Sequence, residues 1–144
     1  MTASTDLCSG DNVCMGSACA PAFPHAYAIT NLSVTAPNLK PNGDPWDPGE
    51  DGAPDLYVDI AVGGTIVTTT AIAAKGYNTT FAGPYTVNLD ANVSLDLTAS
   101  DNDGATSELV YDCSIPMVSA LILRVGYVLC SGTGVTMNYT IHPA

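Results

Sequence analysis

The stretch KPNGDPWDPGEDGAPDLYVDIAVGG, residues 40–64, changes abruptly from a turn-rich acidic loop to an alternating strand. Within it, DLYVDIAVG (55–63) alternates apolar and polar side chains as a half-buried strand does. Gly63-Gly64 then predicts a two-residue hairpin turn, because glycine tolerates the positive φ that such turns require. The same unit, a strand adjoining an acidic loop, recurs at 93–108.

Other segments have the length and composition of strands. ALILRVGYVLC (120–130) is apolar throughout, and its β-branched residues and Gly126 favour a strand over a helix. Short strands between turn signals predict an all-β fold, an antiparallel β-sandwich of about eight strands. We expect the remaining elements to be strands at 26–35, 65–73, 93–100, 109–117 and 135–142, a polar loop at 75–85 and a turn at 131–134.

Composition limits the classes of partner. The 144 residues are 47% hydrophobic, enough for one domain with a core and too apolar for a disordered chain. Fourteen acids against three bases give a formal net charge of −11. Such a surface repels the phosphates of nucleic acid and anionic lipid headgroups. We therefore expect no nucleic-acid binding and weak or no membrane binding.

The five cysteines indicate disulfides and an oxidising compartment, so we expect a secreted or cell-surface protein, extracellular or periplasmic. A zinc site is disfavoured, because the cysteines do not have CxxC spacing and no histidine lies near the N-terminal three. Residues 1–24 are too short for a core and are predicted to be a Cys-rich, disulfide-stapled segment ahead of a sandwich at 25–144. We predict a Cys113–Cys130 bridge, because both residues fall in or beside predicted strands. One of the other cysteines is left over: Cys8, Cys14 or Cys19.

Most acids lie on two loops that can meet at one end of a sandwich. The first holds Asp44, Asp47, Glu50, Asp51 and Asp55, and the second holds Asp101, Asp103 and Glu108. Gathered carboxylates repel one another unless a cation is present, and calcium binds about 6–8 oxygens on flexible loops. Asp101-Asn102-Asp103-Gly104 also resembles the start of an EF-hand loop. The twelfth position is Asp112 rather than Glu, however, and the flanks are predicted strands, which disfavours an EF-hand.

Three blocks of the chain resemble C2 domains, in consistent order over about residues 26–143. Residues 40–64 resemble the first calcium loop and the strand after it. Residues 75–89 resemble the segment in which an asparagine leads to a buried aromatic, here Asn78 and Phe81, although the usual Pro-x-Trp is absent. Residues 95–117 resemble the strand and third loop that carry Asp-x-Asp and a later acid, with Tyr111 replacing the usual glycine.

The resemblance implies a C2-like calcium-binding module whose ion serves stability or calcium-dependent binding. The ligands it implies are Asp47, Asp55, Asp101, Asp103 and Glu108. Asp44 and Asp51 are rivals to Asp47, because the first loop is longer than usual. The lone tryptophan, Trp46, either packs under this loop or stands exposed as a contact for a membrane or ligand.

The alternative is a structural or adhesive surface or fibre subunit, stabilised by calcium and disulfides, that associates with itself or with another surface protein. We expect no enzyme, because no nucleophile–base set and no Gly-x-Ser-x-Gly elbow is visible.

Overall fold

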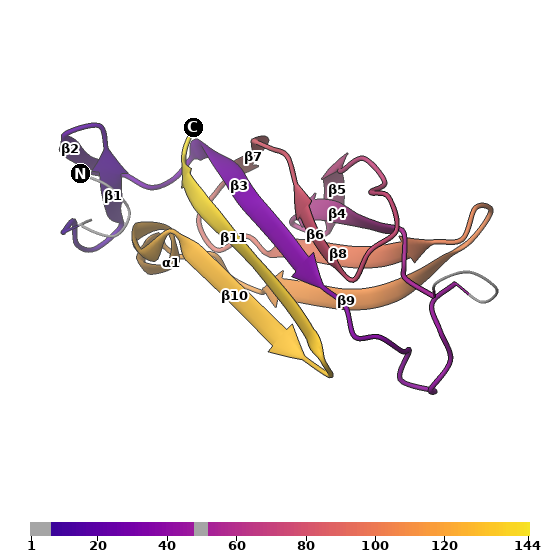
Figure 1. Cartoon of the computed structure of the whole chain (residues 1–144). Coiled ribbons are helices and arrows are strands. Elements are labelled where there is room, and N and C mark those ends of the chain that lie inside the picture. The colour runs from indigo at the N-terminus through magenta and orange to yellow at the C-terminus, as the bar shows by residue number, and fades with distance from the viewer. Residues whose placement is uncertain (1–6, 48–51) are drawn as a thin grey trace.

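The computed structural model describes residues 7–47 and 52–144, which form two β-sheets, a short helix and a small N-terminal hairpin (Figure 1). Glu50 and Asp51 of the first acidic loop lie outside the described residues. The elements are β1 (Asn12–Met15), β2 (Ala18–Pro21), β3 (His25–Thr35), β4 (Leu56–Val62), β5 (Thr65–Thr69), β6 (Asn78–Phe81), β7 (Tyr85–Leu89), β8 (Leu95–Asn102), β9 (Ser107–Ile115), α1 (Ala120–Val125), β10 (Tyr127–Gly132) and β11 (Val135–Pro143).

The two main sheets are antiparallel and together form the predicted sandwich. One has the strand order β5-β4-β8-β9, and the other has the order β10-β11-β3-β6 with β7 also paired to β3. β6 pairs with Leu32–Thr35 and β7 with His25–Ile29, so these two short strands lie end to end along β3. The sandwich therefore has eight strand positions, one of them divided, and the predicted fold class is confirmed.

A bulge at Asn31 keeps the inward face of β3 apolar along its whole length. Asn31 has φ 53°, a conformation that asparagine adopts more readily than most residues. The pairing with β11 shifts register at this point. Tyr27 and Ile29 are buried before the bulge, and Leu32 and Val34 after it. The extra residue thus changes the alternation by one and returns both halves of the strand to the core.

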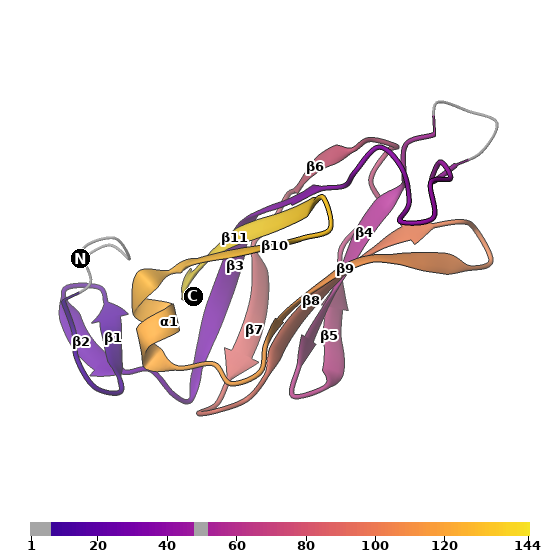
Figure 2. The same ribbon diagram turned by 90° about the horizontal axis from the view of Figure 1, so that it is seen from below.

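Both acidic loops lie at one end of the sandwich, and the N-terminal hairpin and α1 lie at the other (Figure 2). This arrangement follows from the antiparallel pairing of β4 with β8, which sets Leu56 opposite Asp101. The loop before β4 and the loop after β8 are therefore neighbours. The turn predicted at Gly63-Gly64 joins β4 to β5, with φ of 59° and 84° at the two glycines.

Two element predictions were wrong. The strand expected at 120–130 is helix α1 followed by β10, because Ser119 caps the helix N-terminus and Gly126, with φ 71°, ends it. The polar loop expected at 75–85 contains strand β6, whose backbone pairs with the second half of β3. Within the described residues, no helix combines the length and the apolar character needed to cross a membrane.

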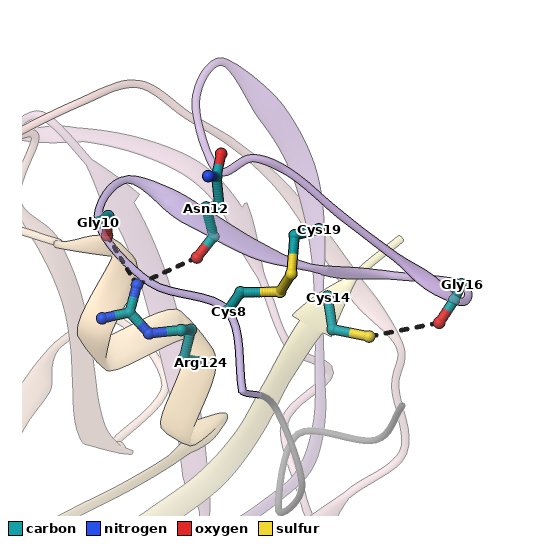
Figure 3. The surroundings of a disulfide bond; sticks show 7 residues. All are labelled: Cys8, Gly10, Asn12, Cys14, Gly16, Cys19 and Arg124. Carbon is teal, nitrogen blue, oxygen red and sulfur yellow. Dashed lines mark hydrogen bonds between the residues drawn. A yellow bond between two sulfur atoms is a disulfide. The ribbon is translucent and has the colours of Figure 1, made fainter.

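The described residues form two disulfides, Cys113–Cys130 and Cys8–Cys19, and the first confirms the predicted bridge. Cys113–Cys130 joins β9 to β10, which are edge strands of different sheets. Cys8–Cys19 closes the β1–β2 hairpin, in which Cys14 lies directly opposite Cys19 and its thiol donates to the Gly16 carbonyl oxygen (Figure 3).

Candidate metal site

Asp101 occupies a core position at the end of β8. Leu95, Leu97 and Ala99 face inward along this strand, and Asp101 is the next residue on the same face. All four are fully buried. The Asp55 backbone N–H donates to Asp101 Oδ1 at 2.8 Å, whereas Oδ2 has no hydrogen-bond partner among the described residues.

The turn after β8 presents Asp103 beside Asp101. The Asp103 backbone N–H donates to the Thr106 carbonyl oxygen at 2.9 Å, which closes the turn between β8 and β9. Gly104 follows with φ 81°, a conformation of sharp turns that other residues adopt with strain. Asp103 is exposed, so the turn carries one buried carboxylate and one that faces solvent.

Asp47 lies near Asp101 and Asp103, on a loop that is ordered by backbone hydrogen bonds and by a buried tryptophan. The backbone N–H groups of Trp46 and Asp47 donate to the Gly52 carbonyl oxygen at 3.1 and 3.3 Å. The Trp46 side chain is 3% exposed and its indole N–H donates to the Pro37 carbonyl oxygen at 2.9 Å. Of the two predicted placements of Trp46, packing under the loop is therefore correct.

Asp47, Asp101 and Asp103 each offer a carboxylate oxygen, and these oxygens lie within 4.8 Å of one another. Calcium binds oxygen at about 2.3–2.6 Å, so two oxygens on one ion are at most roughly 5 Å apart. The spacing of the three oxygens fits a shared calcium ion. The buried Oδ2 atom of Asp101 fits it as well, because a bound cation would supply the missing partner.

The surroundings of Asp101 disfavour its charged form in the absence of a cation. Burial raises the pKa of Asp101 from 3.8 to about 6, opposed by the hydrogen bond from the Asp55 N–H and helped by the charges of Asp103 and Asp47. Although Asp103 is exposed, the partial loss of water around its carboxylate, and then the charge of Glu108, also raises the pKa of Asp103. A divalent cation among these groups would reverse both effects.

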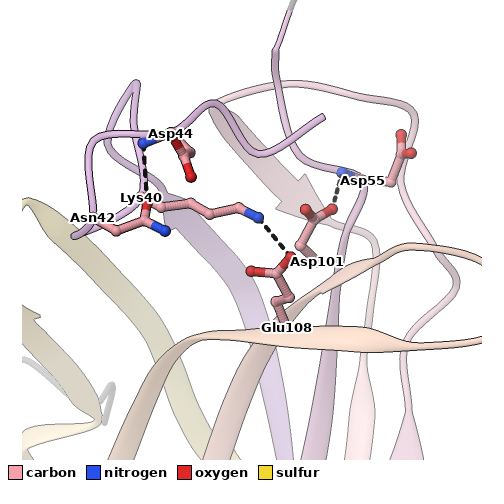
Figure 4. Close-up of polar contacts among 6 residues, drawn as sticks. All are labelled: Lys40, Asn42, Asp44, Asp55, Asp101 and Glu108. Atoms are coloured by element: carbon pink, nitrogen blue, oxygen red, sulfur yellow. Dashed lines mark hydrogen bonds and ion pairs between the residues drawn. The ribbon is translucent and has the colours of Figure 1, made fainter. Parts of the chain in front are cut away.

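The other predicted ligands lie around the three aspartates. Asp55 contributes its backbone N–H to Asp101, and its carboxylate is outside the group of three (Figure 4). Glu108 is opposite Asp101 in the β8–β9 register, but its Oε1 atom is 2.6 Å from Lys40 Nζ. Asp44 is exposed, with its backbone N–H bound to Asn42 Oδ1, and is also outside the group.

Lys40 is the residue of this region that sequence reasoning did not assign to the site. Its salt bridge to Glu108 joins the two acidic loops across 68 positions of sequence. The available signal was its location, since Lys40 is the one base within the acidic loop at 36–54. Charge pattern alone does not give the partner, because five acids of the first loop are nearer in sequence.

No model of a known protein family matches the chain, and no curated protein matches it in sequence. Solved C2-domain structures do match its fold. A structure of a C2 domain has a TM-score of 0.57 at 18% identity, over 81% of this chain and 95% of that one. A C2 domain protein from Ramazzottius varieornatus has a TM-score of 0.59 at 11% identity, over 83% of this chain and 88% of that one.

Longer proteins contain the same fold as one part. Human GIVD cytosolic phospholipase A2 matches with a TM-score of 0.58 at 13% identity, over 83% of this chain. The chain spans only 16% of the phospholipase. The chain therefore has the C2 fold, and the two acidic loops described above lie at one end of that fold (Figure 2).

Proposed function

We propose that the protein is an extracellular calcium-binding C2-like module, in which Asp47, Asp101 and Asp103 bind one Ca²⁺ at the end of the sandwich. The observation that carries the proposal is the fully buried Asp101. Its Oδ2 atom lacks a partner among the described residues, and its carboxylate belongs to a group of three with calcium-compatible spacing. Backbone carbonyls of both loops and water would complete the 6–8 oxygens.

The ion would add a cross-link between two loops that the Lys40–Glu108 salt bridge and the hydrogen bond from the Asp55 N–H to Asp101 already join. Asp47 comes from the loop before β4, and Asp101 and Asp103 come from the end of β8, so one cation would cross-link them. Two disulfides support an oxidising location, where calcium is plentiful. We therefore propose that calcium is a constitutive stabilising ligand rather than a transient signal, and that the module is not catalytic.

The proposal is tested by thermal unfolding in calcium and then in chelator. At a free calcium concentration 100 times the Kd, the native state should gain about 2.7 kcal/mol, a rise in Tm on the order of 10 °C for a domain of this size. Magnesium at equal ionic strength controls for screening. Asp101→Asn should abolish the rise, because it removes the buried charge that faces the ion.

Asp90→Asn is the matched control. It makes the same chemical change at an exposed position after β7, at the opposite end of the sandwich, and should keep the full calcium shift. A wild-type protein whose Tm is the same in calcium and in chelator would rule out the calcium site.

A further inference from the structure

A lysine side chain lies within the acidic end of the sandwich. Lys40 Nζ is 2.6 Å from Glu108 Oε1, and the Lys40 side chain is 16% exposed while that of Glu108 is 43% exposed. Lysine usually extends its ammonium group into water. Here the ammonium group is instead turned toward carboxylates of the second acidic loop (Figure 4).

Local structure holds Lys40 in this position. Its backbone N–H donates to the Asp44 carbonyl oxygen at 2.8 Å, and the Gly43 N–H donates to the Lys40 carbonyl oxygen at 2.9 Å. Lys40 Nζ also lies 6.0 Å from the centroid of the Trp46 ring, within cation–π range. Because Trp46 is itself buried, the lysine rests on a fixed surface and loses less conformational freedom on pairing.

The Lys40 ammonium group interacts electrostatically with more carboxylates than the one that it contacts. The hydrogen bond to Glu108 is the main cause that raises the pKa of Lys40, and the charges of Asp103 and Asp101 raise it further. Lys40 also opposes the rise in the pKa of Asp103. One fixed positive charge therefore already neutralises the Glu108 side of the acid cluster.

We propose that Lys40 is a built-in cation that excludes one calcium ion from the acidic loops, so that the site takes a single ion through Asp47, Asp101 and Asp103. This inference rests on the proposed function, because it concerns the number of ions at the same site. Glu108 stays paired with Lys40 and is withheld as a ligand. A second ion beside Glu108 and Asp103 would have to approach the ammonium group at close range.

Calcium stoichiometry, measured by isothermal titration calorimetry, tests the proposal. The wild type should bind one ion, and Lys40→Gln should bind two, because it removes the charge and releases Glu108. Lys40→Arg keeps the charge and should remain at one ion. The double variant Lys40→Gln/Glu108→Gln should return to one ion, because the released ligand is gone. Fluorescence of Trp46 checks that the loop stays packed in each variant.

The outcomes separate this inference from the proposed function. If the wild type and Lys40→Gln bind the same number of ions, Lys40 excludes none, while the calcium module itself still stands. If only Lys40→Gln binds calcium, the natural chain is not a calcium module, and the single-ion site is overturned as well, because Lys40 then excludes every ion rather than one. If no variant binds calcium, both proposals are overturned.

Discussion

At position 101 the inward face of β8 changes from apolar side chains to a carboxylate. A core position that holds a carboxylate is unfavourable without a partner, since burial removes the water that solvates the charge. Only part of this cost is compensated at Asp101: Oδ1 accepts one backbone hydrogen bond, and Oδ2 accepts none from the described residues. The residue is therefore better suited to holding a cation than to stabilising the metal-free fold.

The free energy of unfolding of the metal-free protein should fall as pH rises from about 4 to about 6. The unfolded chain has the ordinary pKa of 3.8 at Asp101, whereas burial raises the pKa to about 6 in the folded protein. The folded state thus binds the proton more tightly, and this stability is full below the lower value and lost above the higher one. The loss should be about 3 kcal/mol, at about 1.4 kcal/mol for each pKa unit.

Urea unfolding in chelator at several pH values measures this loss. Asp101→Asn should flatten the fall, and Asp90→Asn should retain it. Equal pH dependence in the wild type and Asp101→Asn would show that Asp101 is not the titrating group.

The sequence predicted some of the residues of the site, but not which residues of the two loops contact each other. Asp101 and Asp103 are two positions apart on one turn, so local sequence was enough to join them. Asp47 had rivals in Asp44 and Asp51, because loop length does not say which acid turns inward. The Lys40–Glu108 pair depends on two loops meeting in the folded protein, which no local pattern contains.

Helix α1 shows the limit of sequence reasoning at the scale of the element. Its six residues, ALILRV, carry β-branched side chains and run directly into a strand, so their composition favoured a strand. The deciding residues are the caps at each end, Ser119 and Gly126, which bound a helix of fewer than two turns. The long strands were predictable because their alternation extends over several residues.

The same helix anchors the N-terminal hairpin. Arg124 Nη1 donates to the carbonyl oxygens of Gly10 at 2.7 Å and Asn12 at 3.1 Å (Figure 3). Arg124→Ala should loosen the hairpin, because two backbone oxygens lose a charged donor, each such bond being worth about 1.5–3 kcal/mol. Hydrogen exchange should rise in β1 and β2 and stay unchanged in β8.

Arg124→Lys is the control for the hairpin. A lysine keeps the charge and one donor group, so exchange in the hairpin should rise less than in Arg124→Ala. Unaltered exchange in Arg124→Ala would mean that the Cys8–Cys19 bridge and side-chain packing hold the hairpin without the arginine.

At the scale of the whole molecule, stabilising features are spread along the sandwich. The hairpin and α1 lie at one end and the acidic loops at the other (Figure 2). The Cys113–Cys130 disulfide joins the sheets between them. Cys113 is five residues along β9 from Glu108, roughly 16 Å of extended strand. The disulfide and the metal site thus share no residue and no direct contact in the structure described.

Removal of this disulfide should therefore lower stability without changing the contribution of calcium. Cys113→Ala/Cys130→Ala should reduce the free energy of unfolding by about 2–4 kcal/mol, because the unfolded chain regains the freedom that a 17-residue separation had restricted. The gain on adding calcium should match that of the wild type within about 0.5 kcal/mol, as for distant sites that act independently. Urea unfolding of both proteins, each with calcium and with chelator, completes the cycle. If the variant without the disulfide gains no free energy of unfolding from calcium, the two sheets must be linked before the loops can bind the ion. The metal site would then depend on the whole sandwich rather than on one end of it.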